Sequence, residues 1–210
     1  CASFPEYLPG VVAMFVGAST ADGHNPYRIT RDGIDWEVPD PDDPWANIGY
    51  WGDHQIVYLL RLLEATDRYL PGEIERRLSA PTCTYGDVPY RIASYDQLII
   101  DPKSTVAFDD DVATRVADRV EAIGSDGKMA VGADGEIVHV SLLEKLLVSA
   151  LAKLSNFVPG AGIWMNTQRP EWNDANNALV GYGASMVTLF HLRRCRDHVR
   201  RLADRLPHDV

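Results

Sequence analysis

Residues 52–72, GDHQIVYLLRLLEATDRYLPG, carry the pattern that decides the fold. Their apolar residues recur at the period of one face of an α-helix, at Ile56, Leu59, Leu60 and Leu63. Pro71 and Gly72 follow the run, and both residue types are common where a helix ends. The stretch therefore predicts an amphipathic helix with one buried face.

Three further stretches predict helices. The first begins at the aspartates 109–111 and continues through Val112, Val116, Val120 and Ile123. The aspartates favour a helix N-terminus, with a calcium loop as the lesser alternative. The second carries Leu143, Leu146, Leu147, Ala150, Leu151 and Leu154 and closes near Pro159 and Gly160. The last starts around Gly183 and runs through Met186, Phe190 and Leu202 toward Pro207.

The remaining segments predict little regular structure. Residues 81–108 contain Pro, Gly and Tyr with short β-rich pieces such as QLIID, residues 97–101, and we interpret them as irregular. Residues 125–141, SDGKMAVGADGEIVHVS, contain Asp-Gly twice beside alternating residues, which indicates a β-hairpin. No repeat or linker interrupts the chain, so residues 1–210 are expected to form one mainly helical domain.

Composition excludes several classes of function. The chain is 46% hydrophobic and 24% charged, as in folded globular proteins, and its formal net charge of -10 argues against a nucleic-acid partner. The arginines between residues 193 and 205 alternate with aspartates, which indicates a solvated helix face. No apolar run is long enough to span a membrane. Three cysteines without short spacing fit neither a disulfide framework nor a zinc site, so a reducing, cytoplasmic location is expected.

Two polar segments combine indole rings with carboxylates and amides, and each leads into a predicted helix. Residues 19–54 contain Trp36, Trp45 and Trp51, and residues 167–186, TQRPEWNDANNALVGYGASM, contain Trp172 among acids and amides. Sugar rings stack on aromatic faces, and their hydroxyl groups need dense hydrogen-bond donors and acceptors. The two segments therefore predict a carbohydrate site.

Cleavage of a glycosidic bond requires two carboxyl groups on opposite sides of that bond. The candidates are Glu171 and Asp174 in the later segment, either of which could be the proton donor, and Asp53 in the earlier one. The plainer interpretation is that Asp174 and Asp53 sit at helix starts, where acids are common, and that Glu171 is a surface residue. Side chains expected to contact the sugar are Trp51, His54, Gln55, Trp164, Arg169, Trp172, Asn173 and Asn177.

Residues 171–186, EWNDANNALVGYGASM, resemble a pattern of cellobiose phosphorylases and related members of the six-hairpin (α/α)6-barrel glycosidase superfamily. That pattern reads DWNDG, then N, VG and GES. The resemblance implies that Asp174 is the general acid and that Trp172 and Asn173 shape its site. Residues 50–64 look like the superfamily's SDDLLWLP segment, which places Asp53 and His54 on its acidic pair. Ala175 replaces the glycine of DWNDG, and His54 replaces the second aspartate.

The resemblance implies a carbohydrate-active enzyme that cleaves a β-glucan or oligosaccharide by inversion, through hydrolysis or through phosphorolysis with inorganic phosphate as co-substrate. No metal or other cofactor is expected. Twelve helices of about 11 residues with their loops exceed this chain, so a part of a barrel, completed by another chain or domain, is expected. The alternative is a non-catalytic helical module that binds sugar or has a structural role in a larger protein.

Overall fold

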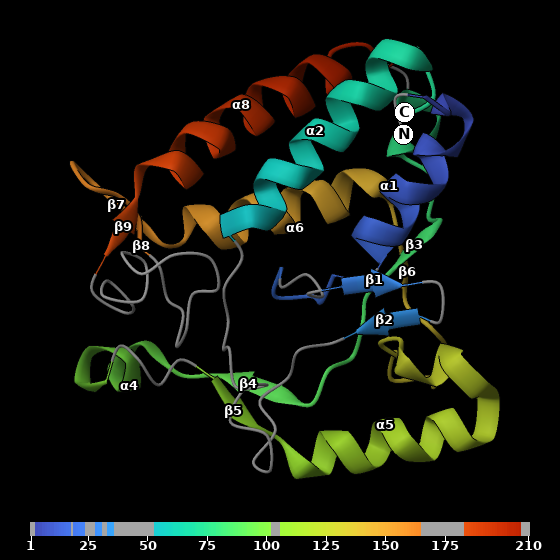
Figure 1. Ribbon diagram of the computed structural model, residues 1–210. Helices are drawn as coiled ribbons and strands as arrows, with labels where there is room; N and C mark the ends of the chain where they lie inside the picture. Colours follow the sequence, from blue (N-terminus) through green and yellow to red (C-terminus); the bar gives the residue numbers. More distant parts are fainter. Residues whose placement is uncertain are drawn as a thin grey trace.

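The computed structural model describes residues 3–17, 19–23, 28–30, 33–35, 53–101, 106–164 and 183–206. Residues 28–30, 33–35, 53–55 and 106 are described by their backbone alone. Within these ranges the chain is mainly helical with small antiparallel strand pairs (Figure 1), which confirms the predicted fold class. Closure into a barrel stays a prediction.

Seven α-helices lie in the described ranges: α1 (Leu8–Gly17), α2 (Asp53–Tyr69), α3 (Glu75–Leu78), α4 (Tyr95–Ile100), α5 (Asp110–Ile123), α6 (Leu142–Leu154) and α8 (Met186–Ala203). Two 3-10 helices, η1 (Pro5–Tyr7) and η2 (Gly124–Lys128), accompany them. The antiparallel strand pairs are β1 (Arg28–Thr30) with β2 (Gly33–Asp35), β3 (Cys83–Thr84) with β6 (His139–Val140), and β4 (Tyr90–Ile92) with β5 (Val106–Phe108). A three-stranded sheet has the order β7 (Phe157–Val158), β8 (Gly162–Trp164), β9 (Ala184–Ser185).

The hydrophobic core lies between α1, α2, α6 and α8, which gather in the upper half of Figure 1. The predicted stripe of α2 is buried in full, at Ile56, Leu59, Leu60 and Leu63. It packs against α1 on one side and α8 on the other. The lower half of Figure 1 holds α4, α5 and the β4–β5 pair, and none of the residues of α4 and α5 is buried.

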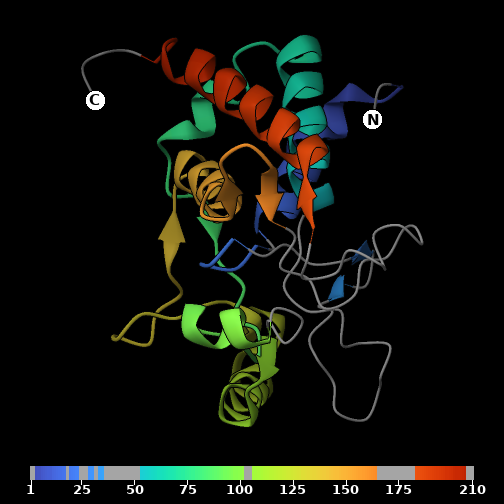
Figure 2. The ribbon, with the colours of Figure 1, turned by 90° about the vertical axis from the view of Figure 1, so that its left-hand side faces the viewer.

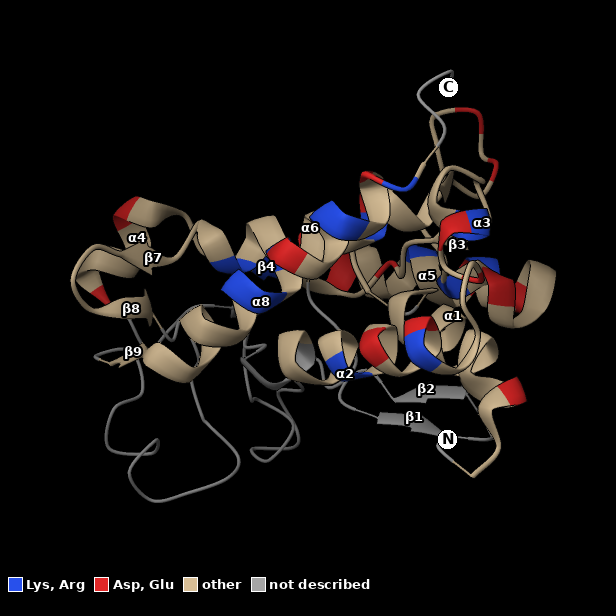
Figure 3. Ribbon diagram, turned by 90° about the horizontal axis from the view of Figure 1, so that it is seen from above, with Lys and Arg blue, Asp and Glu red and all other residues tan. Residues whose placement is uncertain are grey.

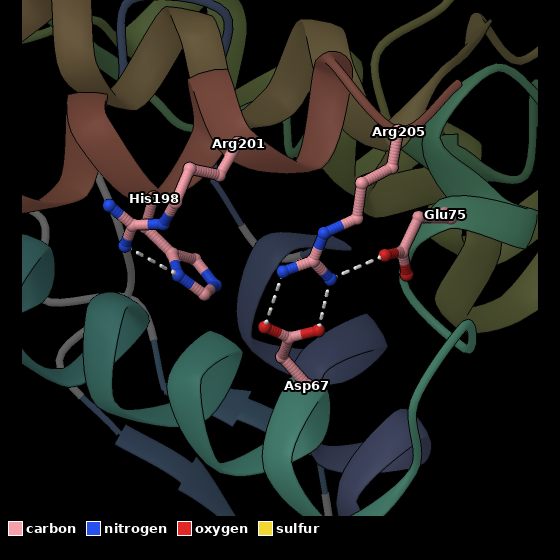
Figure 4. Close-up of polar contacts among 5 residues, drawn as sticks. All are labelled: Asp67, Glu75, His198, Arg201 and Arg205. Carbon is pink, nitrogen blue, oxygen red and sulfur yellow. Dashed lines mark hydrogen bonds and ion pairs between the residues drawn. The ribbon is translucent and has the colours of Figure 1, made fainter. Parts of the chain in front are cut away.

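Helices α2 and α8 run side by side in the same direction (Figure 1). Arg194 of α8 donates to Glu64 of α2 at 2.6 Å. Arg205, just beyond α8, forks between Asp67 of α2 at 2.7 Å and Glu75 of α3 at 2.8 Å (Figure 4). These pairs follow one another in the same order along both helices, so they set the register of the two helices.

His198 of α8 is buried beside this ion-pair group and points toward α2 (Figure 4). Its Nε2 has no hydrogen-bond partner in the described part of the chain, and its Nδ1 lies 3.5 Å from the guanidinium of Arg201. Burial lowers the pKa of His198, while Asp67 raises it and Arg201 lowers it. Burial at the helix interface therefore favours the neutral form of this imidazole.

Charged residues of both signs alternate along the outward sides of α2 and α8 (Figure 3). The arginines that cluster in the last segment of the sequence take part here in ion pairs, such as Arg196 with Asp197 at 2.6 Å. This agrees with the interpretation of the cluster as a solvated helix face. No helix in the described ranges combines the length and the apolar character needed to cross a membrane.

Helix α6 forms where its leucines predict it, but some of these leucines face the core and others face away from it. Its buried residues are Leu142, Lys145, Leu146, Ser149 and Lys153. Leu147, Leu151 and Leu154 are 45%, 57% and 51% exposed. The helix is thus apolar on two opposite faces, and two lysines lie on the inner one.

Lys145 is fully buried and joins three segments of the chain. Its Nζ donates to the carbonyl oxygens of Ser19 at 2.9 Å and Thr84 at 2.6 Å, and lies 3.9 Å from the ring centroid of Tyr85. The Tyr85 hydroxyl donates in turn to Glu144 at 2.8 Å. Burial lowers the pKa of Lys145 to about 7, while Cys83 and Glu144 raise it. Buried polar groups need such partners, because an unpaired one costs free energy on folding.

Two local expectations hold and one is wrong. Asp109 caps α5 by accepting from the backbone N–H of Val112 at 3.1 Å, as a helix N-terminus requires. The hairpin forms only at the second Asp-Gly, where Val131 pairs with Ile137, whereas the first lies in η2. Residues 95–100 were expected to be irregular and β-rich but form α4, because Ser94 and Gln97 make a capping box.

Gly127 of η2 lies directly against α5. A Cβ at this position would come within 2.4 Å of the backbone of Arg119 and Val120, so no larger residue fits. The same contact lets the Arg119 guanidinium donate to the carbonyl of Gly127 at 3.1 Å and to Asp87 at 2.5 Å. This glycine therefore holds α5 against the segment that follows it.

The orientation of α6 can be tested with two neighbouring leucines. Leu146→Ala removes a fully buried side chain and is expected to cost about 2–5 kcal/mol of unfolding free energy. Leu147→Ala removes a half-exposed one and is expected to cost less than about 1 kcal/mol. Urea denaturation followed by circular dichroism measures both. Equal losses, or a larger loss for Leu147→Ala, would contradict this orientation.

The burial of Lys145 predicts a pH dependence of stability. Between the folded pKa of about 7 and the unfolded value of 10.5, the unfolded chain binds a proton that the folded chain does not. The free energy of unfolding of the wild type should therefore rise with pH from about 7 to 8.5 relative to that of Lys145→Met. Above this window, burial of Cys83 and Tyr85, which raises the pKa of both, acts in the opposite direction. Parallel pH profiles of the two proteins would refute the assignment.

Candidate functional site

The predicted site residues fall into three groups. Asp53, His54 and Gln55 form the first turn of α2, where the backbone is described and the side chains are not. Trp164 is the last residue of β8 and is half-buried. The others lie outside the described residues: Trp51, Arg169, Glu171, Trp172, Asn173, Asp174 and Asn177.

The fold brings the ends of both predicted segments to one end of the helix layer. Because α2 and α8 are parallel and in register, the first turn of α2 lies at the same end as the start of α8. Strand β9 directly precedes α8, and its Ala184 pairs with Trp164 of β8. Residues 165–182 therefore leave and re-enter the described fold beside the end where residue 53 begins α2.

A groove with a volume of about 520 Å³ lies at this end of the molecule, which faces the viewer in Figure 2. One wall is α4 and the other is the turn from α6 into β7 together with β8. The residues that line the groove are Tyr95, Leu98, Ile99, Ser155, Asn156, Phe157, Val158 and Trp164. Its volume lies within the range of small-molecule sites.

Local hydrogen bonds shape both walls. The capping box of Ser94 and Gln97 starts α4, and the helical spacing then places Tyr95, Leu98 and Ile99 on one face. On the other side the N–H of Trp164 donates to the carbonyl of Asn156 at 2.7 Å. This bond sets the end of β8 against the end of α6, so the indole of Trp164 faces the groove with Phe157 at its edge.

The lining of the groove suits binding and not bond cleavage. Tyr95, Phe157 and Trp164 offer aromatic surface, and Asn156 and Ser155 offer an amide and a hydroxyl. The Ser155 hydroxyl donates to the carbonyl of Ala152 at 2.8 Å and keeps its lone pairs as acceptors. None of these residues is a carboxylate, an imidazole or a thiol. A catalytic acid or base would therefore have to come from residues other than these eight.

The sequence predicted one residue of the groove and missed the others. Trp164 was expected to contact sugar and does line the groove. Tyr95 and Ile99 were missed because residues 81–108 were interpreted as irregular. The spacing of Ser94 and Gln97 is a helix-start signal that could have identified α4. Phe157 and Asn156 follow a helix end without any motif, so nothing in the sequence singles them out.

No group of three His, Cys, Asp or Glu residues within the described ranges has the arrangement of a metal site. The calcium alternative for residues 109–111 is not supported there, because Asp109 caps α5 and pairs with Arg91 at 2.9 Å. No protein-family model and no curated protein matches this sequence.

Proposed function

We propose that this chain belongs to a carbohydrate-active enzyme that cleaves a glycosidic bond in a β-glucan or oligosaccharide by inversion. Asp174 is the general acid, and Asp53 or Glu171 is the carboxylate on the opposite side of the bond. Trp51, Trp172, Asn173 and Asn177 line the reacting site. The groove at Trp164 binds a sugar residue next to it.

The observation that carries the proposal is the composition and place of the groove. Three aromatic side chains and an amide border a hollow of about 520 Å³, enough for one or two sugar rings. It lies where residues 165–182 leave β8 and return in β9. A sugar stacked on Trp164 would therefore lie at the end of β8, ten residues before Asp174 in the sequence.

The position of the first turn of α2 supports the role proposed for Asp53 as the second carboxylate. The backbone of position 53 lies at this end of the helix layer, together with the amide donors of the helix N-terminus. An inverting enzyme needs its two carboxyl groups about 6.5 to 9.5 Å apart, with a water between one of them and the sugar. Two carboxyl groups can reach this separation if their chain segments join the described fold at the same end of the helix layer. They cannot if the segments join it at opposite ends.

A sugar-binding module without catalysis is the second candidate. It is favoured by one observation, the absence of carboxylates among the described residues that line the groove. Both candidates predict binding at Trp164, and only the enzyme predicts turnover. Binding and turnover are therefore measured separately.

Sugar binding at the groove can be tested by comparing substitutions of its aromatic residues with the substitution of an exposed tyrosine elsewhere. Titration calorimetry with cello-, laminari- and sophoro-oligosaccharides is expected to show binding that Tyr95→Ala and Trp164→Ala each weaken roughly tenfold, which is about 1.4 kcal/mol. Tyr7→Ala is the control, because Tyr7 is 65% exposed and Tyr95 75%, but Tyr7 lies in η1 and away from the groove. An equal effect of all three substitutions would exclude the groove as the site.

Catalysis can be tested at Asp174. Asp174→Asn keeps the shape of the side chain but cannot donate the proton, so turnover should fall by about 10²–10⁴. A reducing-sugar assay with and without inorganic phosphate measures turnover and separates hydrolysis from phosphorolysis. Binding by calorimetry and the thermal melt should stay close to those of the wild type. Full activity of the variant would defeat the assignment of Asp174, and binding without any wild-type turnover would favour the second candidate.

A further inference from the structure

A second, smaller pocket lies where α1 meets α3, β3 and the start of α6. It has a volume of about 60 Å³, and none of the residues that line it also lines the groove. Helix α1 and strand β3 lie on the right of Figure 1, whereas β7 and β8, which border the groove, lie on the left. The two hollows are therefore separate places on the fold.

The floor of this pocket is apolar. Val12, Val16, Ile74 and Leu142 line it, and all four side chains are buried. The hydroxyl of Thr66 also lies there, but it already donates to the carbonyl of its own helix at 2.8 Å. An ordered water usually makes two to four hydrogen bonds, which this floor does not offer. The floor therefore suits a short hydrocarbon group.

The mouth of the pocket carries a guanidinium with donors to spare. Ala13 and Thr82 border the mouth and are exposed, and the side chain of Arg77 is 41% exposed. The Nε of Arg77 donates to Glu73 at 2.8 Å, and its two terminal nitrogens have no partner among the described residues. Such terminal N–H groups bind a carboxylate through two parallel hydrogen bonds.

Glu73 also lines the mouth, but it is already paired through both of its oxygens. Its Oε1 accepts from Arg77, and its Oε2 pairs with Arg76. Burial raises the pKa of Glu73, but its hydrogen bonds to the two arginines lower it overall, so the carboxylate stays ionised. Two arginines against one glutamate leave the mouth with a positive charge. An anionic ligand is therefore favoured over a cationic one.

The volume of the pocket limits the length of the ligand. A single water needs about 10–15 Å³ of such space, so 60 Å³ holds about four to six non-hydrogen atoms. Butyrate matches this size, and acetate is too short to reach the floor with an alkyl chain. Octanoate is too long, because its chain would meet the buried side chains of Ile74 and Leu142.

We propose that this pocket binds a short-chain carboxylate of about the length of butyrate, with its alkyl chain on the floor and its carboxylate on Arg77. The bound ligand would link α1 to α3 and β3. The site does not depend on the proposed function, because it shares no residue with the groove.

A series of carboxylates tests the size and charge of the ligand. NMR titration of the protein amide signals, at constant ionic strength, measures the dissociation constants of acetate, propionate, butyrate and octanoate. Each added methylene should tighten binding about fourfold up to butyrate, as burial of a CH₂ group predicts, and octanoate should bind more weakly than butyrate. Butyramide has nearly the same shape without the charge, and it should bind about tenfold more weakly or worse.

Two neighbouring arginines test the role of the mouth. Arg77→Gln should weaken butyrate binding by about tenfold or more, because it removes the charged fork. Arg76→Gln is the matched control and should bind butyrate as the wild type does, since Arg76 pairs with the same glutamate but does not line the pocket. Ala13→Phe should block the mouth and abolish binding. Thermal melts verify that the three variants are folded.

Protection of a thiol tests the location without any substitution in the pocket. In a background with Cys1→Ser, methyl methanethiosulfonate modifies the remaining thiols, and mass spectrometry follows each one. Butyrate should slow the modification of Cys83, which lines the pocket, and leave that of Cys195 unchanged, because Cys195 is buried elsewhere.

Four results would overturn the proposal: no saturable binding of butyrate, equal binding of butyramide, equal losses in Arg76→Gln and Arg77→Gln, or equal protection of both thiols. Butyrate binding without any sugar binding would support this site and reject the proposed function alone.

Discussion

The parallel packing of α2 against α8 is the constraint on which the rest of the structure depends. Ile56, Leu59, Leu60 and Leu63 bury one side of α2, and α8 covers it with a face that includes Leu192, Cys195 and Leu202. The ion pairs of Arg194 and Arg205 then fix how far one helix is advanced along the other. Exposed ion pairs add little stability by themselves, so their main effect is on register and the burial supplies the energy. This register brings residue 53 and strand β9 to the same end of the protein.

The inner face of α6 shows how the core accommodates a buried lysine. The Nζ of Lys145 reaches two backbone carbonyls and the face of Tyr85, which together satisfy this nitrogen. The segment after α1, strand β3 and helix α6 all meet at this nitrogen. A leucine in its place would fill the space but would remove one hydrogen bond from each of the carbonyls of Ser19 and Thr84. The lysine therefore links these three segments, from the face of α6 that also buries Leu142 and Leu146.

The sequence predicted the elements better than it predicted their orientation. Helices α2, α5, α6 and α8 were all expected, because each carries apolar residues at a helical period. The outward face of α6 was not expected, because the helix carries leucines on two faces and their period does not show which face packs inward. Helix α4 was missed although its capping box was visible. At the site, Trp164 was predicted by residue type, whereas Tyr95 and Phe157 reach the groove only because distant segments pack together.

The contact at Gly127 has a consequence for how the lower part of the molecule responds to mutation. Helix α5 has no buried residue, and the side chain of Arg119 ties it to Asp87 and Gly127. Its attachment also depends on a space that a hydrogen atom fills, next to the backbone of Arg119. Substitutions along α5 away from Arg119 should each have a small effect, but any side chain at position 127 would separate η2 from α5 and release Arg119 from Asp87. Sensitivity to mutation in this region is therefore concentrated at Gly127 and Arg119 and is not graded along the helix.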